Sequence, residues 1–223
     1  MNDVKETQVF WTKLPVHTAL SSAREAGALS NSRSVNTFLQ DPRSRHRMVM
    51  SLFPDIDSST PREKFKILFR LENTPGQAPY FLIQSNVEPT KNLTTEVLTK
   101  EVSFPQFNDG DQIELRLSIN PVKRQENTTV PIRIDPKTGP APLFTWIINK
   151  LSPAINIDEI VNHNQELLGA KTTDTNSKKL VVQIDTIDAI GTVSNASQLH
   201  EWLSNGIGRA KSYGCGLLTA RHI

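Results

Sequence analysis

The chain has 223 residues, which is enough for one large domain or two domains of roughly 100 residues each. Hydrophobic residues make up 37% and charged residues 22%, so a packed core is expected, and no apolar run approaches the ~20 residues of a membrane helix. The single cysteine, Cys215, excludes an internal disulfide and a zinc site built from several cysteines. The first residues carry acids where a secretory signal is basic, so we expect a cytoplasmic protein.

The net charge of +2 is small, but the basic residues are unevenly distributed. Residues 24–47 hold five arginines against two acids, and residues 206–223 hold three basic residues and no acid. Residues 123–137 hold four basic residues against two acids. Such clustering favours one positive surface that binds a polyanion, with ordinary solvated faces as the alternative.

The first predicted element is a strand at about 7–13, which is rich in aromatic and β-branched residues. Residues 20–40 are polar and irregular, and they predict a mobile connection that contains at most a short helix. The sequence DPRSRHRMVMSLFP (41–54) predicts a helix, because Asp41 can cap its start and Pro54 marks its stop.

The sequence KFKILFRLE (64–72) alternates between apolar and basic residues, so it predicts a half-buried strand with Arg70 on the outer side. YFLIQS (80–85) is its predicted hairpin partner. A short helix within 88–99 and a strand at 112–120 would complete a βαββαβ order, which is that of a ferredoxin-like module.

The second half is predicted to repeat that order. Its expected elements are a strand at 128–134, a helix at 141–151, extended segments near 158–169 and 179–193, a helix within 194–206 and a last strand in 216–223. We therefore predict an α+β fold of two tandem ferredoxin-like domains, with residues 1–121 as the N-terminal domain and residues 122–223 as the C-terminal domain.

The segment GIGRAKSYGCGLL (206–218) is rich in glycine and lies between the last predicted helix and the last predicted strand. A dinucleotide fingerprint or a P-loop instead lies between a strand and the helix that follows it. No histidine stands at a metal-binding spacing such as that of HExxH. We therefore expect neither a nucleotide cofactor nor a metal ion.

His46 differs from the other four histidines in its surroundings. It precedes Val49 and Phe53 on one predicted helix face, so it borders the buried stripe of that helix. The arginines at 43, 45 and 47 surround it, and their positive field should keep its pKa from rising. Proton transfer beside a phosphate would use both features, and a structural or surface histidine is the alternative.

Three segments carry a resemblance to a known family. The ending NGIGRAKSYGCGLLTA resembles the C-terminal signature of the CasE-type CRISPR repeat-RNA endoribonucleases, the crRNA-maturing subunit of the Cascade complex. RHRMVMSLFPD resembles the family's first helix, where the catalytic histidine lies eight residues before a proline, as His46 does before Pro54. LRLSINPVK resembles a family strand that ends in Asn-Pro, here Asn120 and Pro121. The three matches occur in family order and span nearly the whole chain.

The resemblance implies two ferredoxin-like (RRM-like) domains and a metal-independent cut at the 3′ base of the CRISPR repeat stem-loop. The RNA's own 2′-OH would attack the phosphate, leaving a 2′,3′-cyclic phosphate and a 5′-OH, and the protein would remain on the mature crRNA with the other Cascade subunits. His46 would be the general acid or the general base, and the sequence leaves these two roles open. The candidate RNA contacts are Arg43, Arg47, Lys123, Arg124, Arg133, Gly206, Gly208, Arg209, Lys211, Ser212, Gly214 and Gly216.

Two alternatives remain beside this hypothesis. Some family members carry a tyrosine one turn before the histidine, where this chain has Arg43, so a catalytically weak or inactive RNA-binding subunit is the second hypothesis. A general RRM-type binder of single strands is the third. Its sheet should present stacking aromatic residues, whereas the phenylalanines of 64–72 alternate in phase with Ile67 and Leu71 and are better explained as core.

Overall fold

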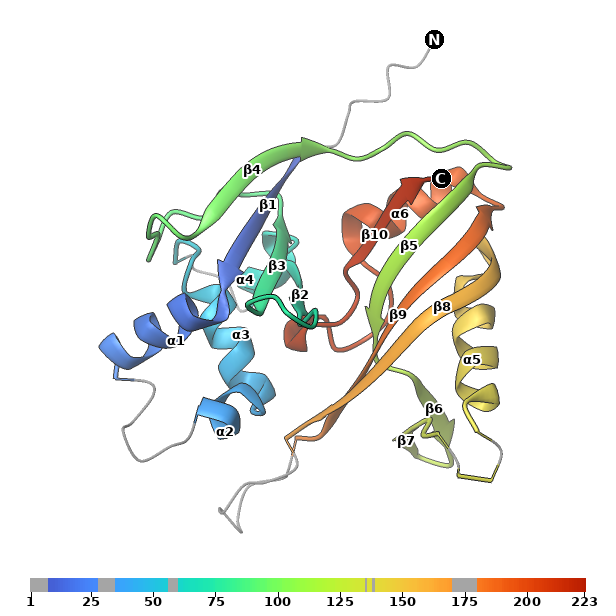
Figure 1. Cartoon of the computed structure of the whole chain (residues 1–223), viewed down its shortest axis with the longest axis horizontal. Helices are drawn as coiled ribbons and strands as arrows, with labels where there is room; N and C mark the ends of the chain where they lie inside the picture. Colours follow the sequence, from blue (N-terminus) through green and yellow to red (C-terminus); the bar gives the residue numbers. More distant parts are fainter. Residues whose placement is uncertain (1–7, 28–34, 56–59, 135, 138, 170–179) are drawn as a thin grey trace. The chain divides into compact units, whose positions relative to one another are not determined.

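The structure is a computed structural model, and it describes residues 8–27, 35–55, 60–134, 136–137, 139–169 and 180–223 (Figure 1). The chain groups into two compact units. Unit 1 comprises Met1–Phe104, Leu167–Val182 and Ala210–Cys215, and unit 2 comprises Pro105–Glu166, Gln183–Arg209 and Gly216–Ile223. The domain boundary predicted between residues 121 and 122 stays a prediction.

Unit 1 contains a four-stranded antiparallel sheet. Its strands are β1 (Gln8–Pro15), β2 (Leu68–Glu72), β3 (Tyr80–Ser85) and β4 (Leu98–Ser103), in the spatial order β2-β3-β1-β4. This is the strand order of a ferredoxin-like sheet, in which the first and third strands occupy the centre. The predicted strands at 7–13 and 64–72 and the hairpin partner at 80–85 are confirmed, although β2 begins only at Leu68.

The described part of unit 1 contains the helices α1 (Val16–Glu25), α2 (Val35–Leu39), α3 (Pro42–Met50) and α4 (Pro61–Lys64). Buried residues of α1, α2 and α3 share one hydrophobic cluster with the sheet, and this cluster includes Leu14, Ala19, Leu20, Phe38, Val49, Phe69, Phe81 and Ile83. The prediction of an irregular connection at 20–40 is wrong for residues 20–25, which belong to α1, whereas α2 is the short helix that the prediction allowed. Val16, Ala19, Leu20 and Ala23 recur at helical spacing and are all buried, but two of the four are small alanines, which weakens the pattern in the sequence.

Two further predictions for unit 1 are wrong. Residues 88–97 contain no helix, and Asn92 has a left-handed backbone with φ of 52°, which a right-handed helix does not accommodate. Arg70 was expected on an exposed face but is only 2% exposed. Its Nε donates to Oε1 of Glu72 over 2.7 Å, so the charge that would have kept it in water is paired.

Unit 2 contains the second four-stranded sheet. Its strands are β5 (Gln112–Ile119), β8 (Ile155–Leu168), β9 (Val182–Val193) and β10 (Leu218–His222), in the order β10-β5-β9-β8. The helices α5 (Ala141–Leu151) and α6 (Ala196–Asn205) follow β5 and β9 in the chain, which completes the ferredoxin-like βαββαβ order (Figure 1). The predicted fold class is therefore confirmed. In the described part of the chain, no helix has the length and apolar character needed to span a membrane.

The predicted place of one strand is wrong. Residues 112–120 were expected to close the first module, but β5 pairs with β9 and β10 and is the first strand of the second. The strand predicted at 128–134 forms β7 (Thr128–Pro131), which pairs with β6 (Val122–Gln125) in a separate hairpin. A periodic pattern identifies a strand, but the partner of a strand depends on residues far away in the chain.

Candidate functional site

The helix α3 carries the candidate catalytic residue and begins as its sequence predicts. The Asp41 carboxylate accepts hydrogen bonds from the Arg43 backbone N–H at 3.0 Å and from the Ser44 hydroxyl at 2.9 Å. His46 follows in the next turn and is half-buried. The Arg47 side chain is 61% exposed, and its Nη2 donates to the Ser44 hydroxyl at 3.2 Å.

The glycine-rich loop lies against this histidine within unit 1. Its 3₁₀ turn, η1 (Lys211–Tyr213), packs on α3 and β2. The Ser212 carbonyl lies near the His46 ring and raises the ring's pKa. The ring Nδ1 is buried, and no described residue forms a hydrogen bond with it. The structure therefore brings together α3, which carries His46, and the 3₁₀ turn of the glycine-rich loop.

The balance of these influences lowers the pKa of His46 below its ordinary value of 6.5. Burial is the largest cause, and the positive charges of Arg62 and Arg47 also lower this pKa. The nearby Ser212 carbonyl acts in the opposite direction and is outweighed. The ring is consequently uncharged in most molecules at neutral pH, so it can accept a proton there.

Arg62 is a member of this site that the sequence did not indicate. It lies on the short helix α4, and its Nη1 donates to the Ile67 carbonyl at 3.1 Å. Arg45 was expected beside His46 but has another role. It is 2% exposed, and its Nε donates to the Leu39 carbonyl at 2.7 Å, so its side chain holds α2 and α3 together.

Gly214 keeps η1 in place and offers a test of the contact with His46. Its φ is +98°, and an added Cβ would lie 3.3 Å from the Phe69 ring. We expect Gly214→Ala to lower the free energy of unfolding by about 1–2 kcal/mol, because alanine is strained in this conformation. The same change should displace Ser212, so the pKa of His46 should fall further. Thermal denaturation and an NMR titration of the histidine would measure these two effects.

Gly110→Ala is a matched control for this prediction. Gly110 has a similar φ of +96°, but nothing lies within 4 Å of its added Cβ. It should therefore cost similar stability and leave the pKa of His46 unchanged. An equal pKa change in both variants would show that Gly214 does not position the Ser212 carbonyl.

The loop's other glycines belong to unit 2, and their backbone groups have different uses. The Gly206 N–H donates to the Trp202 carbonyl at 2.8 Å and ends α6, as the sequence predicts for that helix. The Gly216 N–H donates to the Ser118 carbonyl at 2.7 Å. These two N–H groups are thus already engaged within the protein. Gly208 is exposed and has a φ of +79°.

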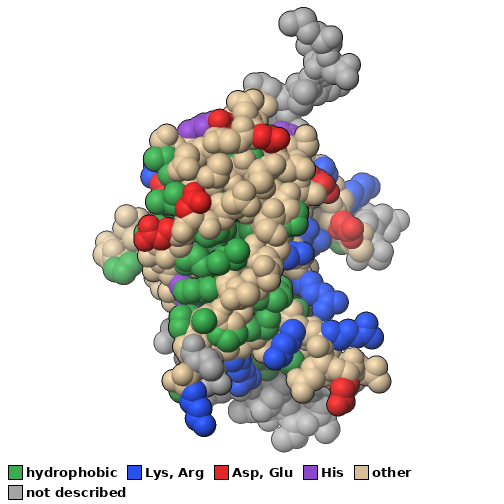
Figure 2. Space-filling model, turned by 90° about the vertical axis from the view of Figure 1, so that its right-hand side faces the viewer, with side chains coloured by type: hydrophobic (Ala, Val, Ile, Leu, Met, Phe, Trp, Pro, Cys, Tyr) green, Lys and Arg blue, Asp and Glu red, His purple; other side chains and the backbone are tan. Residues whose placement is uncertain are grey.

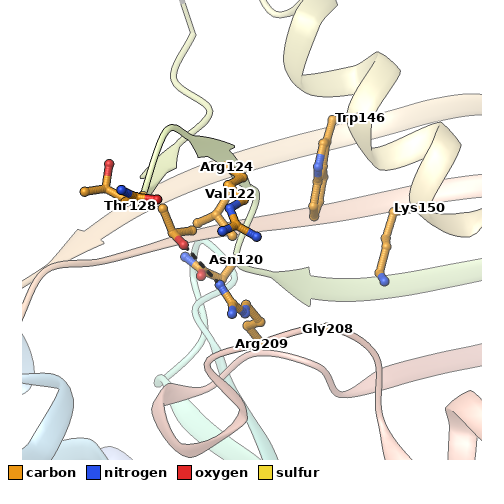
Figure 3. A pocket seen from close by; sticks show the side chains of 10 residues that line it. Asn120, Val122, Arg124, Thr128, Trp146, Lys150, Gly208 and Arg209 are labelled. Atoms are coloured by element: carbon orange, nitrogen blue, oxygen red, sulfur yellow. Dashed lines mark hydrogen bonds between the residues drawn. The ribbon is translucent and has the colours of Figure 1, made fainter.

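Unit 2 also contains an open hollow of about 500 Å³, here called the basic hollow (Figure 3). It is lined by Asn120, Val122, Arg124, Asn127, Thr128, Thr129, Trp146, Lys150, Gly208 and Arg209. Figure 3 shows that Trp146 and Lys150 reach into it from α5, Arg124 from the β6–β7 hairpin and Arg209 from the loop. The hollow therefore combines three of the predicted RNA contacts, Arg124, Gly208 and Arg209, with Trp146 and Lys150, which the sequence did not indicate.

The positive charges of the basic hollow are not neutralised by neighbouring acids. Arg124 donates to the Glu126 carbonyl at 3.3 Å, and Arg209 donates to the Thr129 hydroxyl at 3.4 Å. Within the described ranges, no carboxylate forms an ion pair with Arg124, Lys150 or Arg209. Three such cations around one hollow attract an anionic ligand. Figure 2 shows the same unevenness on one face of the molecule, where Lys and Arg side chains gather beside a stripe of hydrophobic ones.

Three of the basic residues predicted as RNA contacts lie outside both the His46 site and the basic hollow. Lys123 and Arg133 are exposed and do not line the basic hollow. Arg43 is exposed one turn before His46. The sequence does not single out Trp146 and Lys150, because neither belongs to a motif. Their spacing of four residues places them together on the flank of the buried stripe of α5.

The other histidines are engaged in local contacts. His17 lies 3.1 Å from Glu96, and His222 lies 2.9 Å from the Gln106 carbonyl. His163 lies 2.7 Å from Asp185, whose side chain is fully buried. No group of three or more histidine, cysteine, aspartate or glutamate side chains in the described part of the chain is arranged to hold a metal ion.

Comparisons with known proteins agree with these observations. The family model described as "CRISPR associated protein" matches residues 21–221. The Cascade subunit CasE of Escherichia coli (strain K12) is 28% identical over 189 residues, which cover 78% of this chain and 88% of CasE. Thermus thermophilus Cse3, solved with an RNA that represents a pre-cleavage complex, superposes with a TM-score of 0.70 at 22% identity. The superposition covers 96% of this chain and 99% of the Cse3 chain. A chain of a CRISPR RNA-guided surveillance complex gives 0.60 at 19% identity and covers 96% and 100%. At these identities the two structures show a shared fold.

Proposed function

The chain belongs to the family of CRISPR associated proteins, in which it is of the CasE type, and we propose that it is the endoribonuclease that cuts CRISPR repeat RNA at the 3′ base of its stem-loop. The observation that carries this proposal is the half-buried His46 beside two arginines and the Ser212 carbonyl. The related CasE is a Cascade subunit, and the related Cse3 was solved bound to RNA. We accordingly propose RNA and other Cascade subunits as the partners, and a cytoplasmic location.

The proposed reaction needs no metal ion, because the RNA supplies its own nucleophile. His46 removes the proton of the 2′-OH as general base, and the 2′ oxygen forms a bond to the adjacent phosphorus. The bond from phosphorus to the 5′ oxygen breaks, and that oxygen takes up a proton to become a 5′-OH. A 2′,3′-cyclic phosphate remains on the other fragment. The lowered pKa of His46 favours the role of general base over that of general acid at neutral pH.

The arginines near His46 suit the charge that develops in this reaction. Negative charge accumulates on the phosphoryl oxygens as the fifth bond to phosphorus forms, and fixed cations stabilise it. Arg62 is partly buried, so its charge is screened less than that of an exposed residue. The basic hollow of unit 2 would bind a separate part of the RNA backbone.

The proposal is tested by incubating the protein with its cognate repeat hairpin in EDTA and analysing the product ends. A single cut that leaves a 2′,3′-cyclic phosphate and a 5′-OH is expected. Tight hairpin binding without any cut would instead favour a catalytically inactive RNA-binding subunit, the alternative suggested by Arg43 at the position where some family members carry tyrosine. A cut that needs a divalent ion would contradict the proposal.

A change at Arg62 should shift the pH dependence of cleavage. With His46 as general base, the single-turnover rate should rise with pH through the pKa of His46 and level off above it. Arg62→Gln removes a positive charge that lowers this pKa, so the pKa should rise and the ascending limb should move to higher pH. Rates measured from pH 4.5 to pH 8 would locate the limb.

Arg24→Gln is the control, since Arg24 is exposed on α1 and is not among the causes of the pKa shift of His46. It removes the same charge from unit 1 and should leave the midpoint unchanged. A midpoint that moves to lower pH in Arg62→Gln would contradict the assignment of His46 as the base. So would a rate that falls as pH rises in the unmodified protein.

A further inference from the structure

Trp146 differs from the other described residues that line the basic hollow because its side chain is aromatic. It projects from α5 beside Lys150, which follows one helical turn later, and both side chains point into the hollow (Figure 3). α5 packs its core through Leu143, Ile147 and Leu151. Trp146 lies on the flank of that stripe and is only half-buried. The packing of α5 therefore leaves part of the indole uncovered.

This exposed part has the properties of a ligand-binding surface. A large apolar ring that remains in contact with water loses part of the stabilisation that burial would provide. No described residue accepts a hydrogen bond from the indole N–H, so no polar contact explains the position of the ring. The hollow of about 500 Å³ beside it lies within the range of roughly 300–1,000 Å³ that small-ligand sites occupy.

We propose that the basic hollow holds one unpaired nucleotide of the bound RNA, with its base stacked on Trp146 and its phosphate between Lys150 and Arg209. This inference rests on the proposed function, because that function makes RNA the ligand. Proteins commonly hold splayed-out bases on aromatic rings, and the contact suits any base because each has a π face. A base inside a duplex is covered by its neighbours and cannot reach the ring.

Asn120 fits this occupant as well. Its side-chain nitrogen donates to the Gln183 carbonyl over 2.7 Å, which fixes the orientation of the amide. Gln183 is 2% exposed, and its own side chain donates to Asp185 over 2.7 Å. The wall of the hollow at Asn120 is therefore held in place by hydrogen bonds, and a preorganised wall lowers the entropy cost of ordering a ligand.

The first test compares the binding of two RNA ligands in a His46→Ala background, in which we expect slow cleavage. One ligand is the cognate repeat hairpin with its unpaired flanks, and the other is a blunt duplex of the same stem. Trp146→Ala should weaken binding of the flanked hairpin by roughly 5- to 150-fold, the loss of one stacked base, and leave the duplex unchanged. Trp146→Phe keeps an aromatic ring and should therefore bind the flanked hairpin much more tightly than Trp146→Ala does. This result would show that substitution at this position does not unfold the site. Trp11→Ala, on β1 of unit 1, should change neither affinity.

A second test locates the nucleotide. Abasic riboses are placed one at a time at each unpaired position, and binding is measured with and without Trp146→Ala. At one position the two changes should not be additive, because both remove the same stack. Additive losses at every position would overturn the inference, and so would an equal loss of duplex binding in Trp146→Ala, which would place the ring against the stem. If neither ligand binds the parent protein, the proposed function itself fails.

Discussion

His46→Ala should lower the single-turnover rate of hairpin cleavage by about 10²- to 10⁴-fold, which is the usual contribution of a positioned general base. The variant removes the only proton acceptor that we assign to the 2′-OH, but it leaves the basic hollow of unit 2 unchanged. Hairpin binding should therefore persist. Quenched-flow or manual time courses with enzyme in excess, together with fluorescence anisotropy, would separate the two quantities.

His17→Ala is the matched control for this prediction. His17 is an exposed histidine of unit 1, with 62% of its side chain accessible, and it contacts Glu96 rather than α3. Its removal should leave the cleavage rate unchanged. Cleavage by His46→Ala at the parent rate would remove His46 from the mechanism. Loss of hairpin binding in His46→Ala, in parallel with loss of cleavage, would assign it a structural role.

Helix positions in the second half of the chain could be predicted because their signals are local. The prediction of a helix at 141–151 coincides with α5, and α6 begins after the Asn195 cap and ends at Gly206. In each case an apolar period or a capping residue lies inside the element itself. The predicted cap of α3 at Asp41 is confirmed for the same reason.

The pairing of β5 could not be predicted in this way. Its alternation shows that Ile113, Leu115 and Leu117 face a core, but the same alternation would suit either sheet. The choice depends on β9 and β10, which lie far along the chain. Arg70 illustrates a second limit, since a charged residue predicts exposure only while its partner is unknown.

The candidate site was predictable only in part. His46 and the glycine-rich loop were each singled out by their own residues, yet the contact between His46 and Ser212 is a tertiary one that neither segment encodes alone. Arg62 lies in a short helix whose sequence has no motif, and its effect on His46 arises from position in space. Electrostatic neighbours of this kind become visible only in the folded chain.

Removing the three cations of the basic hollow together should weaken RNA binding more than any single change there. We expect the triple variant Arg124→Gln, Lys150→Gln, Arg209→Gln to raise the Kd for the repeat hairpin by about 100-fold, if each cation contributes about 1 kcal/mol. For each phosphate contact that is lost, one counterion fewer is released from the RNA when the protein binds. The slope of log Kd against log salt concentration should therefore become shallower by about 3. Titrations between 50 and 300 mM KCl would measure both quantities.

A charge-matched control distinguishes this site from general attraction between a positive protein and RNA. The triple variant Lys13→Gln, Arg24→Gln, Lys100→Gln removes three exposed cations from unit 1, none of which lines the basic hollow. Long-range attraction depends mainly on the total charge, so it would weaken equally in both variants. Direct phosphate contacts would be lost only from the hollow. A salt slope that falls by the same amount in both variants would therefore contradict the hollow as a binding site, whereas a change confined to the first variant would place the RNA backbone there.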